Sequence, residues 1–402
     1  MKKLRFLLCL LLASGALLAA PAAFAQEAED LTLKCDITVS SKLWTAPRLS
    51  DRDWDSYWNG EDGGGKSVRI SSPAPVYGLY LCWMEEPRAW TLETKTKGVW
   101  DKKDMEPSPF QHQYIPLDGA REIVLKPQGG NRKWFGFSEL FVLGEGEVPG
   151  YVQQWKAPDG ECDLMVFFAH PDDESLFFGG TIPEYAGERG LDVVAACFSN
   201  ANRTRTSELL NSLWTMGMTN YPVFGPFHDS FSKRLATAYK EFNEQKVKRY
   251  AVELFRQYKP RVVVTHDLNG EYGHGMHMMC ADAALYAFDL AADAGKYGQS
   301  AELYGAWQVS KLYLHLYPEN EIEMDWDRPL VAFRGRSGFE MAQEGYLRHQ
   351  TQQRLEQFRP EPRDSAYSSY RFGLAKTAVG PDTRKNDLME NIPLDAFLVK
   401  EP

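Results

Sequence analysis

The sequence is poor in cysteine, carries no excess of positive charge and, after its first residues, has no long apolar run. Its six cysteines among 402 residues are too few for a disulfide framework. The formal net charge of −10 argues against nucleic acid or an anionic membrane surface as a partner. No later segment reaches the roughly 18 uninterrupted apolar residues of a membrane span, and no internal repeat is evident. The length allows two or three folded domains.

The first 25 residues have the composition of a cleavable export signal. Three basic residues within the first five positions precede an apolar core at 6–18. Ala23-Phe24-Ala25 then provides the small residues of a cleavage site. We therefore expect a secreted protein, extracellular or periplasmic, that is cleaved near Ala25. Loss of the three basic residues takes the formal charge from −10 to −13.

Five cysteines would remain after cleavage: Cys35, Cys82, Cys162, Cys197 and Cys280. Cys35 and Cys82 are candidates for a disulfide in an oxidising compartment, although their sequence positions leave the pairing open. Cys162 and Cys197 lie in or beside apolar runs and are expected to be unreactive core thiols.

Residues 26–143 have the pattern of an all-β domain. Short alternating runs, as at 67–70, 78–83 and 122–125, are separated by Gly, Pro and Asp, and no long helical periodicity occurs. This pattern is typical of a β-sandwich. The segment at 144–160, which begins with alternating Gly and Glu, is the expected linker to a second domain.

Tryptophan is concentrated in this first domain. Seven of the eleven tryptophans fall within it: Trp44, Trp54, Trp58, Trp83, Trp90, Trp100 and Trp134. Exposed Trp and Tyr rings could stack on sugars, so the domain is a candidate carbohydrate-binding module. The alternative, which we favour for any single tryptophan, is that the ring fills the sandwich core.

From residue 161 the pattern changes to alternating strands and helices. Strands are expected at 164–168, 192–198, 261–265 and 312–316, with one helix ending near 189 and others at 205–216, 232–258 and 276–292. Such alternation predicts an α/β fold, a Rossmann-like and mostly parallel sheet with helices on both faces. We assign this domain to 161–320. A C-terminal extension at 321–402 is expected to contain one helix, at 338–358.

Polar clusters follow two of these apolar strands. Ala169-His170-Pro171-Asp172-Asp173-Glu174 comes after the run at 164–168. Gly273-His274-Gly275-Met276-His277 follows the run at 262–265 after a turn-rich loop. In an open α/β sheet, binding sites form outside the carboxyl ends of the strands. Two histidines and one aspartate with room for water are typical of a catalytic metal site.

Each residue of these clusters also has a purely structural explanation. Asp172 and Asp173 suit the positive end of the following helix. His274 and His277 are spaced to share a helix face without any metal. The interpretation as a site is favoured because both clusters terminate apolar strands.

The first cluster resembles the first motif of the PIG-L/LmbE-type metal-dependent N-acetylglucosaminyl deacetylases. The segment 266–277, His-Asp-Leu-Asn-Gly-Glu-Tyr-Gly-His-Gly-Met-His, is similar to the second motif of that family. Arg205-Thr206-Ser207-Glu208 and Asp229 fit two intervening elements, and His349-Gln350-Thr351-Gln352 resembles a tail motif. The resemblance covers about 160–300, or extends to 355 if the tail motif is included. The N-terminal region resembles, more loosely, a discoidin-like or galactose-binding-type sandwich.

The resemblance implies a metal, with zinc expected first and Fe²⁺ or another divalent ion as the alternative. Its ligands would be His170, Asp173 and His277. Asp172 would then be the general base, because its neighbour is spent on the ion and Asp172 stays free to take a proton from activated water. The metal and His274, the latter as an imidazolium, would stabilise the oxyanion of the tetrahedral intermediate.

Three further residues are implied to contact the substrate: Arg205, Asp229 and Tyr272. Arg348 and His349 lie on a helix that could reach the site, but we favour a solvated helix face for both.

One departure from the family concerns the spacing of the two histidines. Family members often carry Pro-Asp between them, whereas this chain has Gly275-Met276, so the tuning of His274 stays open. Cys280, three residues beyond His277, is a candidate soft ligand. We favour core packing for Cys280, because the oxygen and nitrogen ligand set is already complete.

The leading hypothesis is a secreted metal-dependent hydrolase that removes acetyl groups from N-acetylated amino sugars in a glycan or glycoconjugate. An amidase acting on another small amide would use the same chemistry. A non-catalytic glycan-binding or adhesion protein is the alternative from another class, and the intact set of His170, Asp172, Asp173 and His277 argues against it. We also expect the sandwich to hold carbohydrate without being needed for bond cleavage, because all candidate catalytic residues lie beyond 160.

Overall fold

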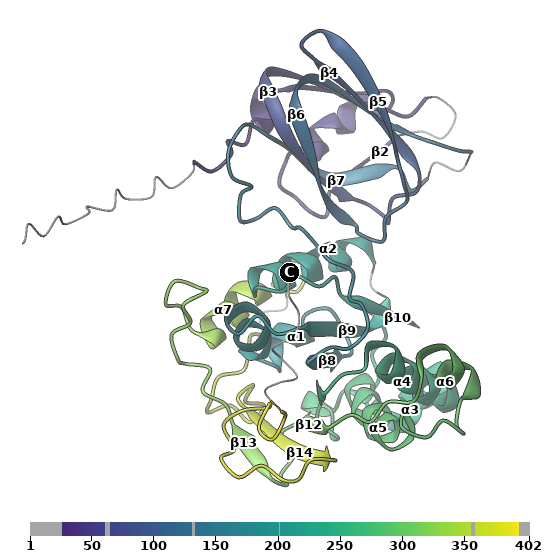
Figure 1. Cartoon of the computed structure of the whole chain (residues 1–402), viewed down its shortest axis with the longest axis vertical. Coiled ribbons are helices and arrows are strands. Elements are labelled where there is room, and N and C mark those ends of the chain that lie inside the picture. Colours follow the sequence, from purple (N-terminus) through teal and green to yellow (C-terminus); the bar gives the residue numbers. More distant parts are fainter. Residues whose placement is uncertain (1–25, 61–64, 131–132, 201, 355–357, 394–402) are drawn as a thin grey trace, which may run out of the picture.

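The computed structural model of the chain describes residues 26–60, 65–130, 133–200, 202–354 and 358–393. The expected export signal at 1–25 lies outside the described residues. The described residues form two bodies, an all-β domain and an α/β domain (Figure 1). Among them, no helix combines the length and the apolar character that a membrane crossing needs.

The N-terminal domain is built from antiparallel strands that fold around an aromatic core. Its strands are β1 (Asp36–Val39), β2 (Trp58–Asn59), β3 (Val68–Trp83), β4 (Trp90–Thr96), β5 (Val99–Met105), β6 (His112–Pro127) and β7 (Gly136–Leu143). Their order is β2-β7-β3-β6-β4-β5, with β1 paired to one end of β3. The long strands β3 and β6 lose register between Ser71 and Gly78. Such bulges bend strands, which lets these strands enclose a core as a sandwich does.

The tryptophans of this domain divide into core and surface groups. Four are buried: Trp58, Trp83, Trp90 and Trp134. The ring of Trp83 lies against those of Trp90 and Trp134, with 5.3 and 5.9 Å between ring centroids. Trp44 and Trp100 are 77% and 47% exposed. Core packing is therefore the correct interpretation for four of these rings, and two others face solvent.

The cysteines of the described residues are all free thiols. Cys35 and Cys82 therefore do not form the disulfide that an oxidising compartment would have allowed. Cys162, Cys197 and Cys280 are buried in the apolar clusters of the second domain. Burial raises the pKa of the Cys197 and Cys280 thiols, as expected of unreactive core cysteines.

The C-terminal domain is a seven-stranded sheet between two helical layers. Its strands are β8 (Leu164–Phe168), β9 (Val193–Asn200), β10 (Val223–His228), β11 (Val262–Thr265), β12 (Lys311–His315), β13 (Glu321–Glu323) and β14 (Arg371–Thr377). The order β10-β9-β8-β11-β12 is parallel throughout, and β14 and β13 continue the sheet in antiparallel pairing. The domain is thus a mostly parallel α/β sheet, as predicted.

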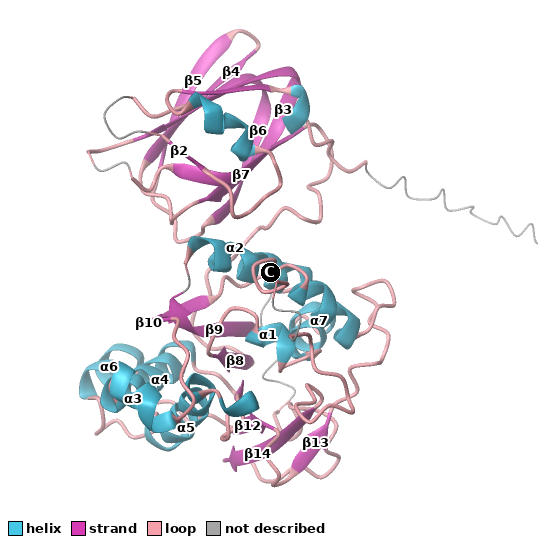
Figure 2. Cartoon of the chain, turned by 180° about the vertical axis from the view of Figure 1, so that it is seen from behind, coloured by secondary structure: helices cyan, strands magenta, loops and turns pink. Residues whose placement is uncertain are grey.

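Helices cover both faces of this sheet. They are α1 (Asp173–Leu176), α2 (Arg203–Thr215), α3 (Leu235–Phe242), α4 (Glu244–Tyr258), α5 (Gly275–Leu290), α6 (Gly298–Tyr304) and α7 (Gly338–Tyr346), with short turns η3 (Pro183–Glu188) and η4 (Glu271–Gly273). α1, α2 and α7 lie on one face, and α3, α4 and α5 lie on the other (Figures 1 and 2).

Three predicted helices differ from those observed. The helix expected at 232–258 is split into α3 and α4, because Asn243 has a positive φ of 67° and its side chain caps α4 by accepting the N–H of Lys246. The helix expected at 338–358 ends at Tyr346. The helix expected after the first strand is the short α1 followed by the π-helical turn η3.

The strand order places both polar clusters at the same edge of the sheet. From β8 the chain runs outward through β9 and β10, and it then returns to add β11 and β12 on the other side of β8. A crevice opens at the carboxyl ends of the strands where the strand order reverses in this way. Here the reversal lies between β8 and β11, which are buried along their whole length because helices cover both faces.

The two domains contact each other through α2, which lies directly beneath the sandwich (Figures 1 and 2). The side-chain amide of Gln111 donates to Ser207 Oγ at 3.1 Å, and the backbone N–H of Gln111 donates to the Tyr221 hydroxyl at 3.1 Å. The Thr204 hydroxyl donates to Asp55 at 3.0 Å. These directed hydrogen bonds determine how the two domains face each other.

The C-terminal extension, for which the sequence predicted only one helix, is a structural part of the second domain. Besides β13 and β14, it supplies the partners of a buried cation on β12. The Lys311 ammonium is fully buried and donates to Asp382 and to the carbonyl oxygens of Leu388 and Glu390. Asp382 also accepts the Tyr313 hydroxyl at 2.6 Å.

We expect Asp382→Ala to destabilise the fold strongly, because it leaves the Lys311 ammonium buried without its carboxylate partner. The free energy of unfolding, measured by urea titration, should fall by about 3–5 kcal/mol. Asp325→Ala is the control, since Asp325 is 73% exposed and lies 3.9 Å from Arg363. Its loss should cost less than about 1 kcal/mol. Equally small losses in both variants would contradict a structural role for the extension.

Candidate metal centre

Two strand ends, with the helices that follow them, bring the site together. β8 ends at Phe168, and the segment after it leads directly into α1. β11 ends at Thr265, and the loop after it leads through η4 into α5. Because β8 and β11 are adjacent and parallel, side chains from the two loops meet at one edge of the sheet.

Three predicted ligands converge on a common point. His170 Nδ1 lies 3.2 Å from Asp173 Oδ2 and 3.3 Å from His277 Nε2. His277 Nε2 lies 3.4 Å from Asp173 Oδ1. Ligand atoms about 2.0–2.1 Å from a tetrahedral zinc ion are separated by roughly 3.3–3.4 Å. All three residues are buried, and the distances between their ligand atoms fit a divalent metal ion.

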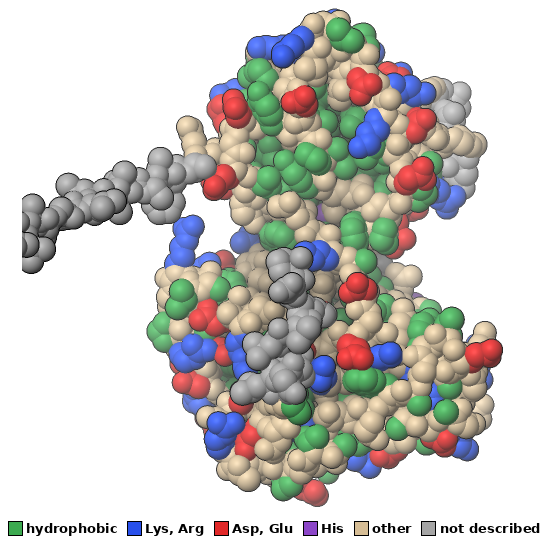
Figure 3. Space-filling model, in the orientation of Figure 1, with side chains coloured by type: hydrophobic (Ala, Val, Ile, Leu, Met, Phe, Trp, Pro, Cys, Tyr) green, Lys and Arg blue, Asp and Glu red, His purple; other side chains and the backbone are tan. Residues whose placement is uncertain are grey.

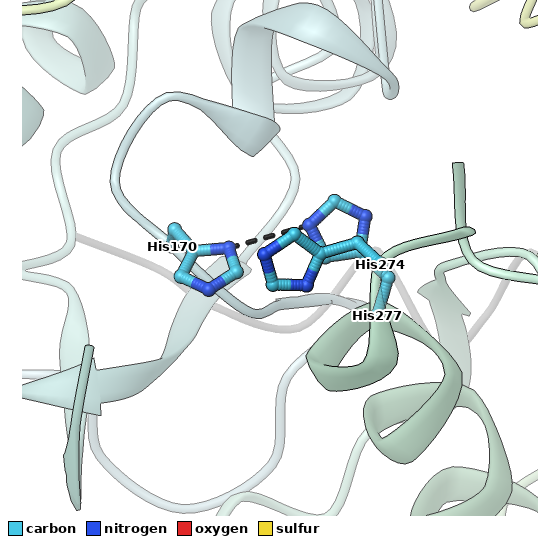
Figure 4. Close-up of side chains that lie close together, drawn as sticks. All are labelled: His170, His274 and His277. Carbon is cyan, nitrogen blue, oxygen red and sulfur yellow. Dashed lines mark hydrogen bonds between the residues drawn. The ribbon is translucent and has the colours of Figure 1, made fainter. Parts of the chain in front are cut away.

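His274 and His266 lie beside these ligands, with one ring nitrogen of His274 and both ring nitrogens of His266 engaged by neighbouring groups. Figure 4 shows His274 next to His277 at the start of α5, with His170 approaching from the segment after β8. His274 Nδ1 accepts the N–H of Met276 at 3.2 Å as the N-cap of α5. His266 Nε2 accepts the N–H of Ala169 at 3.0 Å. The described residues thus offer two overlapping groups of ligand atoms: His170, His274 and His277, and Asp173, His266 and His277. Each of the predicted ligands His170, Asp173 and His277 belongs to at least one of these groups.

A buried carboxylate behind the ligands orients three histidines. Glu271 Oε2 accepts from His277 Nδ1 at 2.7 Å and from His266 Nδ1 at 2.9 Å, and Oε1 accepts from His315 Nδ1 at 2.6 Å. Because His277 donates through Nδ1, its Nε2 lone pair stays available to a metal. The pKa of His277 is lowered to about 4, chiefly by burial. The ring is therefore neutral near pH 7, as a metal ligand must be.

Asp172 lies next to these ligands but directs its carboxylate toward Arg205. Its Oδ2 is 3.2 Å from Arg205 Nη2. Its backbone has a φ of 123°, a strained value for a residue with a side chain. Glu174 holds this backbone by accepting the Asp172 N–H at 2.8 Å. Burial raises the pKa of Asp172 to about 7 against the opposing effect of Arg205, a value suited to a general base near neutral pH.

Glu174 is itself held by a residue of the C-terminal extension. Its Oε1 accepts from the Ser212 hydroxyl at 2.6 Å and from His349 Nε2 at 2.7 Å. The interpretation of His349 as part of a solvated helix face is wrong, because α7 ends at Tyr346 and the chain then turns His349 into the core. The neighbouring Arg348 has a side chain that is 49% exposed, as expected.

The surroundings of His274 favour the neutral ring over the expected imidazolium. Burial, the largest cause, and the neighbouring His277 and His170 lower its pKa to about 2. Because Nδ1 accepts the Met276 N–H, the proton of the neutral ring lies on Nε2. His274 is therefore a neutral hydrogen-bond donor. Met276, at the position where the family often has Asp, places its Sδ 3.3 Å from His170 Nε2.

The three predicted substrate-binding residues have different environments. Arg205 makes ion pairs with Asp172 and Asp229, each at 3.2 Å, and also donates to the carbonyl oxygen of Pro171. The structure thus places Arg205 against the candidate base, and its two ion pairs engage its two Nη atoms. Asp229 is 38% exposed at the edge of the site. Tyr272 is 41% exposed, and its ring lies against those of His274 and His277.

Several residues of the site were not predicted from the sequence, among them Glu174, Glu271 and Phe231. The two glutamates stand inside the recognised motifs, but their roles follow from complete burial, which no local pattern indicates. Phe231 is 65% exposed and meets the His274 ring edge-on, with 4.9 Å between ring centroids. The sequence feature that could have indicated Phe231 is its position as a large apolar residue two places after Asp229.

Residues 165–288 match the protein-family model described as PIG-L: GlcNAc-PI de-N-acetylase. Among curated proteins, the 1D-myo-inositol 2-acetamido-2-deoxy-alpha-D-glucopyranoside deacetylase of Salinispora arenicola is 31% identical over 202 residues, which cover 43% of this chain and 61% of that protein. The protein of the same name from Geodermatophilus obscurus is 29% identical over 185 residues, covering 39% of this chain and 62% of that protein. The chain thus spans about three fifths of the length of these relatives.

Solved structures are similar to about 29% of the chain. Chitosan-binding module 1 of a chitosanase/glucanase from Paenibacillus sp. IK-5 has 16% sequence identity and a TM-score of 0.26, with 99% of that chain covered. A fucolectin from Morone saxatilis serum has 13% identity and a TM-score of 0.25, with 47% of that chain covered.

We expect Glu271→Gln to weaken metal binding, because an amide cannot hold three histidines as Nδ1 donors. Loss of such a partner typically costs about 10–100-fold in metal affinity, which competition with a chelator would measure. Glu139→Gln is the matched control, since Glu139 is a fully buried carboxylate of the sandwich that pairs with Arg52 at 2.8 Å. Unchanged affinity in a folded Glu271→Gln protein, judged by circular dichroism, would refute this role of Glu271.

Proposed function

We propose, on the premise that residues 165–288 form a PIG-L domain, that this protein is a metal-dependent hydrolase that removes acetyl groups from N-acetylated amino sugars. The observation that carries the proposal is the buried set of His170, Asp173 and His277 beside a carboxylate, Asp172, that the set does not use. We propose zinc as the ion, with Fe²⁺ or another divalent ion as the alternative. The composition of residues 1–25 supports action outside the cytoplasm.

The residues of the site divide the chemistry of amide hydrolysis among them. A divalent ion held by His170, Asp173 and His277 would supply Lewis-acid activation of water and of the acetyl carbonyl group. Asp172 accepts a proton from the attacking water as the new C–O bond forms. His274 donates its Nε2–H to the carbonyl oxygen as negative charge develops there. Asp172 then returns the proton to the nitrogen as the C–N bond breaks, which yields acetate and a free amine.

The aromatic and charged residues at the edge of the site support a sugar as the group that carries the amide. Tyr272 and Phe231 lie on the rim beside His274, with exposed rings that can pack on the apolar face of a sugar. Asp229 offers carboxylate oxygens that can accept sugar hydroxyl groups. Release of amine from other small amides but not from N-acetylated sugars would favour the amidase alternative.

The two adjacent aspartates should behave differently when each is changed to asparagine. Asp172→Asn should keep its metal, because the ligands are intact, but its turnover should fall about 10²–10⁴-fold because an amide cannot accept the proton. Asp173→Asn removes an anionic ligand, so metal content should drop and added zinc should restore part of the activity. Metal analysis of both variants, together with acetate release from N-acetylglucosamine, would measure this.

The reverse pattern, with metal lost only from Asp172→Asn, would exchange the two roles. Wild-type rates in both variants would show that this cluster is not catalytic and would support the glycan-binding alternative.

The pH dependence of the reaction should report the pKa of Asp172. The general base acts only when it is deprotonated, and burial has raised the pKa of Asp172 to about 7. We therefore expect kcat/KM to rise with pH around pH 7. Arg205 lowers the same pKa, so Arg205→Gln should move the rise to higher pH by about one unit or more. Arg249→Gln, an exposed arginine on α4, is the control. An unshifted profile for Arg205→Gln would mean that another group limits the rate.

A further inference from the structure

A cleft of about 1420 Å³ lies between the sandwich and the α/β domain. We propose that this cleft binds the sugar residues next to the one that is deacetylated, so that the preferred substrate is a neutral N-acetylated oligosaccharide. The inference rests on the proposed function and adds to it a binding site that both domains build. Figure 3 shows the molecule narrowing where the two domains meet.

Both domains contribute walls to the cleft. The sandwich supplies the loop between β3 and β4, with Glu85, Glu86 and Arg88, and the loop between β5 and β6, with Pro107 and Pro109. All five of these side chains are exposed. On the opposite side, the α/β domain supplies the N-terminal turn of α2 and part of β10. A ligand in the cleft would therefore touch both domains at once.

The cleft lies next to the catalytic site. Arg205, on the first turn of α2, is part of the cleft wall, and the same guanidinium pairs with Asp172 at 3.2 Å. Arg205 is thus common to the cleft wall and to the surroundings of the candidate base. A chain of sugars with one acetamido group at Asp172 would pass Arg205 and continue into the cleft.

The volume of the cleft indicates more than one sugar unit. Pockets of roughly 300–1,000 Å³ enclose a drug-sized ligand, and this cleft exceeds that range. It is bounded by the interdomain hydrogen bonds, because Gln111 and Tyr221, which bond to each other, both line it. The space is therefore held open by the native contact between the domains.

The charges of the lining favour a neutral ligand. Three carboxylates and three guanidinium groups line the cleft: Asp55, Glu85, Glu86, Arg88, Arg203 and Arg205. The carboxylates would repel a polyanion, and the guanidinium groups would repel a polycation. Hydroxyl and acetamido groups can both donate and accept hydrogen bonds, so a neutral N-acetylated sugar can use both kinds of partner. Exposed prolines add flat apolar surface that can pack against sugar rings.

The exposed tryptophans of the sandwich offer a competing location for the sugar. Trp44 and Trp100 are the exposed tryptophan rings of this domain, and neither lines the cleft. Sugar binding at these rings would make the sandwich an independent module. Sugar binding in the cleft would instead make it one wall of an extended active site, which is what we infer.

The test compares the N-acetylglucosamine tetramer with the monomer on the full chain. We expect wild type to prefer the tetramer in kcat/KM. In the metal-loaded Asp172→Asn protein, which prevents turnover, the tetramer Kd measured by calorimetry should rise about tenfold upon Arg88→Ala, the factor expected for one lost hydrogen bond to a charged group. The double change Glu86→Ala/Arg88→Ala should weaken the tetramer further. Trp100→Ala, an exposed change on the same domain, should leave the Kd unchanged.

The binding and rate measurements separate this inference from the proposed function. Tetramer binding that weakens in the cleft variants supports the cleft even if no acetate is released, a result that would overturn only the proposed deacetylation. Acetate release with equal kcat/KM for monomer and tetramer, and no change in tetramer Kd for either cleft variant, would overturn the cleft while the deacetylase stands. A tetramer Kd that rises in Trp100→Ala but not in the cleft variants would also overturn it, in favour of the tryptophan surface.

Discussion

The carboxylate of Glu271 is the interaction on which the rest of the metal centre depends. It is fully buried and holds His277 from α5, His266 from the end of β11 and His315 from β12. Burial would raise its pKa, but the neighbouring His266 and the hydrogen bonds of the three histidines hold it well below the usual range. A charge so deep in a protein persists only where several donors compensate it. One residue thus ties the ligand geometry to the two strands and the helix that carry it.

Around this constraint, two neighbouring carboxylates acquire opposite properties. Burial alone would raise the pKa of Asp173. The histidines beside Asp173, of which His277 has the largest effect, instead hold this pKa well below its usual range. Asp172 has Arg205 as its nearest cation, and burial raises its pKa to about 7. When the surroundings of two adjacent acids shift their pKa values in opposite directions, the two acids are suited to different roles, here base and ligand. The strained backbone of Asp172 is held by Glu174, and the two adjacent side chains have different partners, Arg205 for Asp172 and histidines for Asp173.

The sandwich is bound to this centre more closely than an independent module would be. Its loops bond to α2, the helix whose first turn carries Arg205, through Gln111 and Asp55. The same helix provides Ser212, which helps to hold Glu174. Movement of the sandwich would therefore be transmitted to the side chains that orient the base, and the cleft between the domains shares a wall with the catalytic site.

The sequence by itself determined those features of the protein that depend on residues close together in the chain. Apolar runs predicted β8 and β11, and the change of periodicity near 161 predicted a β-rich domain followed by an α/β domain. The two polar clusters were expected to form one site, because parallel strands that lie side by side must deliver their carboxyl-terminal loops to one edge. The resemblance of their motifs to a known family then indicated His170, Asp173 and His277 as ligands.

Only the tertiary structure decided which of these groups are charged, held or exposed. Glu174 meets His349 from 175 positions away, and Lys311 meets Asp382 from 71 positions away. The neutral state of His274 follows from burial among other histidines, and the engagement of Arg205 follows from the fold of α2 onto the site. Periodicity and motifs report local geometry, whereas the protonation state and partners of a side chain depend on burial and on residues distant in the chain, which only the folded structure brings together.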